Sequence, residues 1–133
     1  MHLRNSVSGF LGSVFGLLAV ALGAFGAHAL EGRLTLQELA TFETAARYQM
    51  IHALALLAVA LLPPGGTGRR ATLPGWAFTL GILLFSGSLY LMVFTGQRWL
   101  GAVTPLGGAA FLVGWGALGW RFMELSREKA DHA

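Results

Sequence analysis

Residues 6–29 read SVSGFLGSVFGLLAVALGAFGAHA and contain no Asp, Glu, Lys or Arg. A helix needs about 20 apolar residues to cross the hydrocarbon core of a bilayer, so this stretch is long enough to span it. The motif Ala27-His28-Ala29 fits the cleavage pattern of a secretory signal peptide. The apolar run is longer than the roughly 7–15 residues of a signal peptide, so we expect it to be retained as a first transmembrane helix.

The composition of the whole chain is typical of a membrane protein. Hydrophobic residues make up 55% of the 133 residues and charged residues only 11%, whereas a soluble domain carries about 25% charged residues. The nine Lys and Arg are scattered between apolar stretches, so nucleic acid is not an expected partner. The chain has no cysteine, which excludes disulfides, thiolate metal sites and thiol catalysis.

Three further segments carry the signals of membrane-spanning helices. Thr35 followed by Glu38 is a capping box, in which each side chain binds a free backbone N–H of the first helical turn. We predict one helix from Thr35 to Leu62, whose first part lies in the membrane interface or in the mouth of the bundle. The predicted fold is an all-α, polytopic four-helix membrane bundle with an interfacial amphipathic extension before the second span. It forms one domain, residues 1–133, with spans at about 6–29, 42–62, 74–95 and 104–123.

The fourth span has its own start signal. Thr104 and Pro105 match a helix cap followed by proline at the first helical position, where a missing N–H costs nothing. Residues 99–103 are therefore not expected to form regular helix. Nonhelical backbone at membrane depth is tolerated only where protein or a wet cavity covers it.

The distribution of basic residues predicts the orientation, because positively charged loops stay in the cytoplasm. With four spans, the two termini and the second loop share one side, and the other two loops share the opposite side. The first side holds Arg4, Arg69, Arg70, Arg121, Arg127 and Lys129, and the second holds Arg33, Arg47 and Arg98. We predict a multi-pass inner-membrane protein with both termini in the cytoplasm.

Glycines recur at helical spacing on the first and fourth predicted helices. Helices in lipid associate where small residues let their backbones approach, so we predict tight packing seams, with a groove for a lipid tail or small ligand as the alternative. On the fourth helix the small residues occupy two opposite faces, of which one could meet the first helix and the other a second subunit, although the bundle interior alone could use both. The predicted packing positions are Gly9, Gly12, Gly16, Gly23, Gly107, Gly108 and Gly114.

Polar residues inside the predicted spans form one candidate cluster. Ionisable groups at membrane depth are costly and suggest function, and both His28 and His52 are predicted at the noncytoplasmic end of adjoining helices. They could converge on a proton relay, a transition metal or a haem iron. Alternatively, each imidazole and hydroxyl bonds to a carbonyl or a neighbouring helix. Two histidines without a carboxylate make a weak metal signature, so we assign no metal and no cofactor. The candidate residues are His28, Tyr48, Gln49, His52, Ser86 and Tyr90.

Four strings together resemble a known family. They are GAFGAHAL at 23–30, YQMIHALALL at 48–57, FSGSLYLM at 85–92 and LGAVTPLGG at 100–108. Their order and spacing are similar to those of the domain of unknown function 423 family, also called the transmembrane protein 256 family. The resemblance covers nearly the whole chain and implies a bacterial inner-membrane protein of four spans with no established activity.

Three functions remain open on the sequence. The leading one is a noncatalytic membrane protein that self-associates or joins a larger membrane complex through its glycine-rich faces. A second is a small transporter or channel with a polar cavity near His28 and His52, and a third is a metal- or haem-binding accessory protein. No nucleophile elbow, phosphate loop or metalloprotease motif occurs, so we expect no enzymatic activity. The lipid bilayer is the expected surrounding, and a homo-oligomer or a complex subunit the expected partner.

Overall fold

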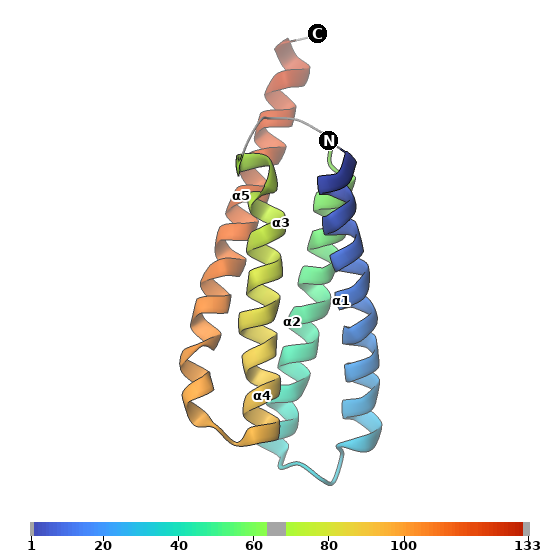
Figure 1. Ribbon diagram of the computed structural model, residues 1–133, viewed down its shortest axis with the longest axis vertical. Helices are drawn as coiled ribbons and strands as arrows, with labels where there is room; N and C mark the ends of the chain where they lie inside the picture. The colour runs from blue at the N-terminus through green and yellow to red at the C-terminus, as the bar shows by residue number, and fades with distance from the viewer. Residues whose placement is uncertain (1, 64–68, 132–133) are drawn as a thin grey trace.

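The computed structural model describes residues 2–63 and 69–131. These residues form four antiparallel helical passes, the third made of three successive helical segments (Figure 1). Four helices are long and apolar enough to cross a membrane, which confirms the predicted all-α polytopic bundle. The elements are α1 (His2–Ala29), α2 (Leu36–Leu61), α3 (Arg69–Gly81), η1 (Ile82–Ser86), α4 (Gly87–Thr95), η2 (Arg98–Ala102) and α5 (Thr104–Asp131).

A short turn folds α2 back along α1. Gly32 adopts a positive φ of 77°, a conformation that glycine reaches without steric cost. The capping box then starts α2. The Thr35 N–H donates to Glu38 Oε2 at 2.9 Å, and the Glu38 N–H donates to Thr35 Oγ1 at 3.2 Å. These two bonds confirm the cap predicted from the sequence.

The first turns of α2 belong to the bundle. Phe42 is fully buried and packs against Gly26 of α1. Its ring also meets the edges of Tyr90 at 5.1 Å and Phe94 at 5.9 Å between centroids. From Phe42 onward α2 therefore lies in the mouth of the bundle, whereas Leu36 at its start is exposed.

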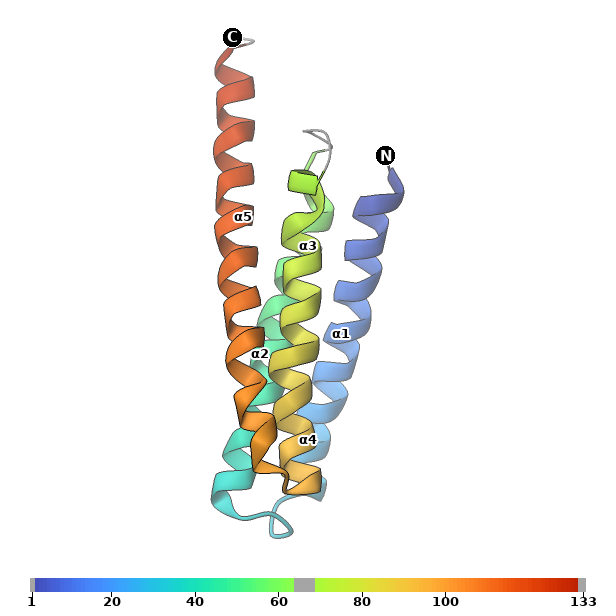
Figure 2. The same cartoon turned by 60° about the vertical axis from the view of Figure 1, so that its left-hand side comes forward.

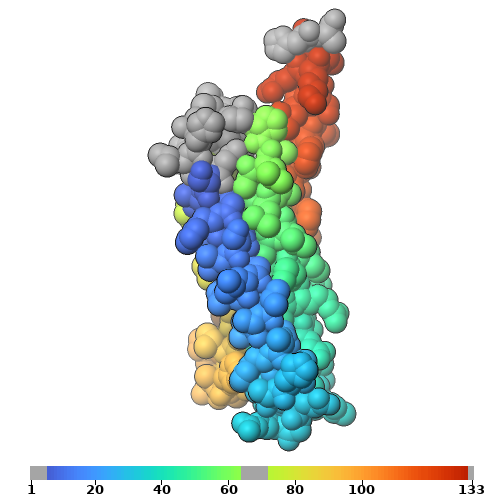
Figure 3. Space-filling view, turned by 90° about the vertical axis from the view of Figure 1, so that its right-hand side faces the viewer, coloured from blue at the N-terminus to red at the C-terminus, as the bar shows by residue number. Residues whose placement is uncertain are grey.

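The first and last helices of the bundle, α1 and α5, are not packed on each other. The largest helix contacts are of α1 with α2, and of α5 with α3 and η1. Figures 1 and 2 place α1 and α5 on opposite sides of α2 and the third pass, and Figure 3 shows α1 lying along α2. The expectation that the fourth predicted helix packs on the first is therefore wrong. The helix α1 packs mainly on α2, and α5 packs on the third pass.

The third pass contains a π-helical turn, η1, that the sequence did not predict. The extra residue of such a turn disturbs the regular hydrogen-bond ladder. The backbone of Phe85, within η1, lies against Gly107 of α5 so closely that a Cβ on Gly107 would overlap it. At this point α5 and the third pass are in contact through their backbones.

The connection between α4 and α5 is irregular, as predicted. Gly96 ends α4 with a φ of 70°, and the 3₁₀ turn η2 follows. The helix α5 begins at Thr104. The Thr104 hydroxyl bonds to Ser88 Oγ at 2.7 Å and to the Leu100 carbonyl at 3.4 Å, so it ties α5 to α4 instead of serving as the predicted helix cap.

Candidate functional site

Gln49 is the centre of the polar contacts between the helices. It is only 4% exposed on α2. Its amide nitrogen donates to the Phe15 carbonyl of α1 at 2.9 Å, and its amide oxygen accepts from the Tyr90 hydroxyl of α4 at 2.9 Å. One side chain therefore joins three passes, and its two partners determine the orientation of its amide.

Ser86 makes a second polar link between α2 and the third pass. Its hydroxyl is buried and donates to the Ala45 carbonyl at 2.8 Å. This carbonyl is one turn before Gln49 on the same helix. The predicted residues Gln49, Ser86 and Tyr90 thus lie together in one short section of the bundle.

His52 lies farther along α2 and faces α5. Its Nδ1 donates to the Tyr48 carbonyl at 2.7 Å, and its Nε2 accepts from the Trp115 indole N–H at 3.1 Å. An indole can only donate, so the proton of the neutral imidazole must be on Nδ1. The ring stacks on Phe111 with centroids 3.4 Å apart. Both ring nitrogens and one ring face therefore have partners.

Tyr48 is at the edge of this aromatic group. The residue is 39% exposed, and its ring lies 4.7 Å from that of Phe85 and 6.0 Å from that of His52. Its phenol does not take part in the Gln49 links. Tyr48 thus covers the outer side of the aromatic layer between α2 and α5.

His28 does not join His52, contrary to the sequence expectation. His28 is exposed at the end of α1, whereas α1 meets α2 near His52 at Gly16, which faces Ala53. The helical rise from Gly16 to His28 is roughly 18 Å. A shared metal with bonds of roughly 2 Å cannot bridge that distance. The sequence gives no register between α1 and α2, and because α2 begins at Leu36, His52 lies several turns inside it.

The predicted packing glycines differ in how closely they are approached. A Cβ on Gly12 would lie 2.9 Å from the Ala53 carbonyl oxygen, and one on Gly114 would lie 2.7 Å from the Phe78 ring. With Gly107, these positions are the tight ones. Gly9, Gly16 and Gly108 have ordinary contacts of 3.4 to 4.0 Å, and Gly23 has no neighbour within 4 Å. Gly23 is therefore not a packing position of the bundle.

Three close glycine contacts were missed. Gly26 faces Phe42, Gly81 faces Phe111, and Gly75 faces the Ser8 hydroxyl. Only the rotation and register of the packed helices bring each of these glycines against its partner.

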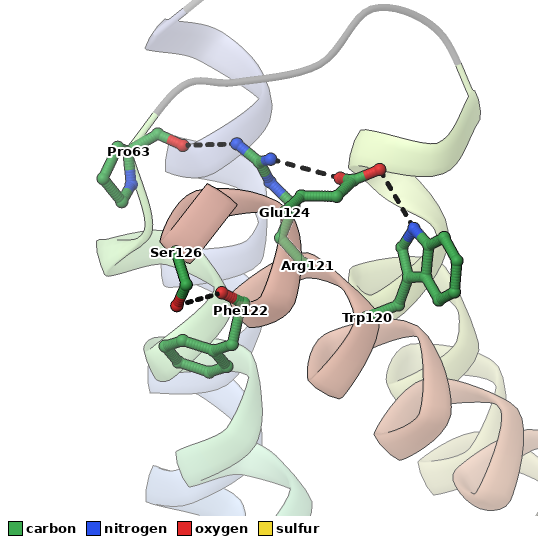
Figure 4. Close-up of polar contacts among 6 residues, drawn as sticks. All are labelled: Pro63, Trp120, Arg121, Phe122, Glu124 and Ser126. Carbon is green, nitrogen blue, oxygen red and sulfur yellow. Dashed lines mark hydrogen bonds and ion pairs between the residues drawn. The ribbon is translucent and has the colours of Figure 1, made fainter. Parts of the chain in front are cut away.

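An arginine-centred cluster at the end of the bundle was also missed (Figure 4). Arg121 of α5 is 5% exposed. Its guanidinium donates to the Pro63 carbonyl at 3.3 Å and pairs with Glu124 at 3.3 Å, while the Trp120 indole N–H donates to the same carboxylate at 3.0 Å. The cluster fastens the end of α2 to α5. The i,i+3 spacing of Arg121 and Glu124 was the available signal.

These contacts describe a network that holds helices together. Within residues 6–63 and 72–131, whose side chains the structure describes, no buried side-chain nitrogen or oxygen lacks a hydrogen-bond partner. Unpaired polar groups are expensive in a low-dielectric interior, so this pairing stabilises the bundle. The arrangement supports helix packing better than an open polar cavity.

Comparisons with known proteins agree with this fold. The family model described as "Protein of unknown function (DUF423)" matches residues 22–108. The UPF0382 membrane protein YwdK of Bacillus subtilis is 49% identical over 106 residues, which cover 79% of this chain and 86% of the relative. The UPF0382 membrane protein SSP2132 of Staphylococcus saprophyticus is 46% identical over 105 residues, covering 79% and 87% respectively. No solved structure matches significantly. The relatives are named membrane proteins, and the chain belongs to the DUF423 family.

Proposed function

We propose that this protein is a noncatalytic inner-membrane bundle that associates in the bilayer with a second copy or with a subunit of a membrane complex. One observation carries the proposal. Glu43 and Arg47 are exposed on the outward side of α2, and the hydrogen bonds and ion pairs of the described residues include neither side chain. Two opposite charges thus face away from the bundle.

Both charges lie below the edge of the apolar region of the bundle. Phe42 is level with Gly26, and the apolar span of α1 ends at Ala29. The rise from Phe42 to Arg47, added to that from Gly26 to Ala29, is roughly 12 Å. Arg47 therefore lies inside the apolar region, and Glu43 lies about one helical turn nearer the edge of that region.

Charges at such a depth need a partner. Placing an arginine near the centre of a membrane helix costs about 2.5–3.5 kcal/mol on insertion scales. A neighbouring protein that supplies the opposite charge offsets part of this cost. The tightly packed glycines do not indicate a contact with a second protein, because their neighbours belong to the same chain.

The paired interior supports the noncatalytic part of the proposal. Gln49 and His52 have each of their polar side-chain groups bound to protein partners. Neither presents a free group to a substrate. Both residues instead fix the relative positions of the helices.

We further propose that both termini face the cytoplasm. The helix α1 begins and α5 ends at the same end of the bundle (Figure 1), so the two termini share one side. Six Lys and Arg belong to this side of the sequence, whereas the other side has Arg33 and Arg98, with Arg47 deeper in α2, which favours a cytoplasmic placement. Cysteines at Gln37 and Arg127 test it on intact cells with an impermeant thiol reagent. We expect labelling at position 37 only, and the reverse would contradict the orientation.

Counting subunits tests the association. The full-length protein, fluorescently tagged at its C-terminus, would be extracted from its native membrane in lipid nanodiscs and bleached one molecule at a time. We expect most discs to contain two or more tagged copies, or one copy with a stoichiometric second protein. Discs that hold single copies and no other protein at native expression would contradict the proposal.

A further inference from the structure

The outward face of α2 has the residue spacing of a parallel helix pair. Its residues occur in two series with a repeat of seven, offset from each other by four positions. A repeat of seven keeps one seam of a helix against a parallel neighbour. Figure 3 shows one side of α2 uncovered beside α1. The first series is Ala40, Arg47, Leu54 and Leu61, all exposed, and the second is the half-buried Thr44 with the exposed Ile51 and Ala58. The exposed Glu43 borders this face beside Thr44.

We propose that a second copy of this chain docks on this face about a two-fold axis along the membrane normal, with Glu43 of each copy paired to Arg47 of the other. The inference rests on the proposed function, because it names the partner for the same exposed charges. Two copies inserted with one orientation have their α2 helices parallel and level. Each residue of the face then opposes the same face of the other copy.

The direction of the side chains suits this pairing. Side chains in a helix lean toward its N-terminus, so Arg47 extends toward the level of Glu43. In a two-fold contact, each Arg47 reaches the Glu43 of the second copy and both pairs form together. The pairs would lie in a medium of low dielectric constant, where opposite charges attract strongly. Glu43 and Arg47, which form no ion pair with the described residues of their own chain, are then both paired.

Charge complementarity favours a second copy over a lipid headgroup. A headgroup phosphate would pair with Arg47 but would also lie near the Glu43 carboxylate, which repels it. A second copy supplies a cation and an anion at the required positions. Ala40 is exposed at one end of the face and Ala58 near the other, and both let the backbones approach, while Ile51 and Leu54 fill the centre.

Disulfide formation in native membranes tests the geometry, since the chain has no cysteine of its own. In the full-length protein, Ile51→Cys lies near the proposed axis. Leu17→Cys is the matched control, because Leu17 is 69% exposed on α1, and the packing of Gly16 on Ala53 puts it level with Ile51. On oxidation we expect a dimer from Ile51→Cys and only background from Leu17→Cys.

Charge reversal in the Ile51→Cys background tests the pairing. Glu43→Arg and Arg47→Glu each place like charges across the axis, so each alone should weaken dimerisation about a hundredfold. Co-expressed with different tags, the two variants should cross-link to one another. This restoration in trans distinguishes a lost charge pair from misfolding, because misfolded chains would not recover by mixing.

Several outcomes would overturn the inference. Unchanged cross-linking in both reversals, or no recovery on mixing, excludes the charge pairs. A phospholipid that native mass spectrometry finds on the monomer and that Arg47→Glu releases would identify a lipid site instead. A disulfide to a different protein would exclude the second copy but leave the proposed association intact. Single copies in the subunit count would reject the proposed function as well.

Discussion

The contact of α1 with α2 and the contact of α5 with the third pass both depend on glycine, but the glycines meet different atoms. In the α1–α2 contact, a Cβ on Gly12 would lie 2.9 Å from the Ala53 carbonyl oxygen and 3.1 Å from Leu56 Cβ. In the contact of α5, a Cβ on Gly114 would meet the ring of Phe78, and one on Gly81 would meet that of Phe111.

This difference separates two uses of glycine in a membrane bundle. Between α1 and α2, glycine determines how closely two backbones approach, and the opposing atoms cannot move unless the helices separate. Between α5 and α3, glycine leaves a hole that a phenylalanine ring fills, and a ring can rotate or shift. Each contact has an exception: Gly26 of α1 meets the ring of Phe42, and Gly107 of α5 meets the backbone of Phe85.

The largest effect is expected from Gly12→Ala. The new methyl group would overlap the backbone of α2, and overpacking of this kind costs about 1–3 kcal/mol. Gly16→Ala is the matched control on the same helix face, since its Cβ would meet Ala53 at an ordinary 3.9 Å and alanine favours helix by up to about 1 kcal/mol. Thermal unfolding in detergent should show Gly12→Ala clearly less stable than the wild type and Gly16→Ala at least as stable. Equal stability of the two variants would remove the distinction between the contacts.

An intermediate effect is expected from Gln49→Leu, which cuts the link between α1 and α4. The change strands the Tyr90 hydroxyl, and a hydrogen bond between membrane helices contributes about 0.6 kcal/mol on average and up to about 1.7. Adding Tyr90→Phe removes the stranded group, so the double variant should lose less stability than the two single losses added together. Additive losses in the same unfolding assay would show that the bond does not couple the passes.

The smallest effect is expected from Gly114→Ala. The Phe78 ring can move away, so the loss should stay below the roughly 1–3 kcal/mol of overpacking against fixed atoms. Combining it with Phe78→Leu should recover part of the loss that each change causes alone, because the shorter side chain leaves room for the methyl group. A loss as large as that of Gly12→Ala would mean that both contacts respond as rigid backbone does.

The sequence predicted most residues of the candidate site but not which hydrogen-bond partner each of them has. Gln49, His52, Ser86 and Tyr90 were selected because polar groups are rare at membrane depth. The acceptor of the Tyr90 hydroxyl and the indole that donates to His52 come from distant parts of the chain. The same reasoning grouped His28 with His52, since composition places a residue near a membrane surface without giving the register between two helices.

The sequence by itself determined that this protein crosses the membrane four times, because backbone groups in lipid must be satisfied within helices of sufficient apolar length. It also determined the start of α2, since the Thr35 cap is a local arrangement of four residues. Only the tertiary structure decided which glycines are tight, where the π turn lies and which side of α2 presents Glu43 and Arg47. These features depend on the register and rotation of packed helices, which the sum of many weak contacts along their length determines.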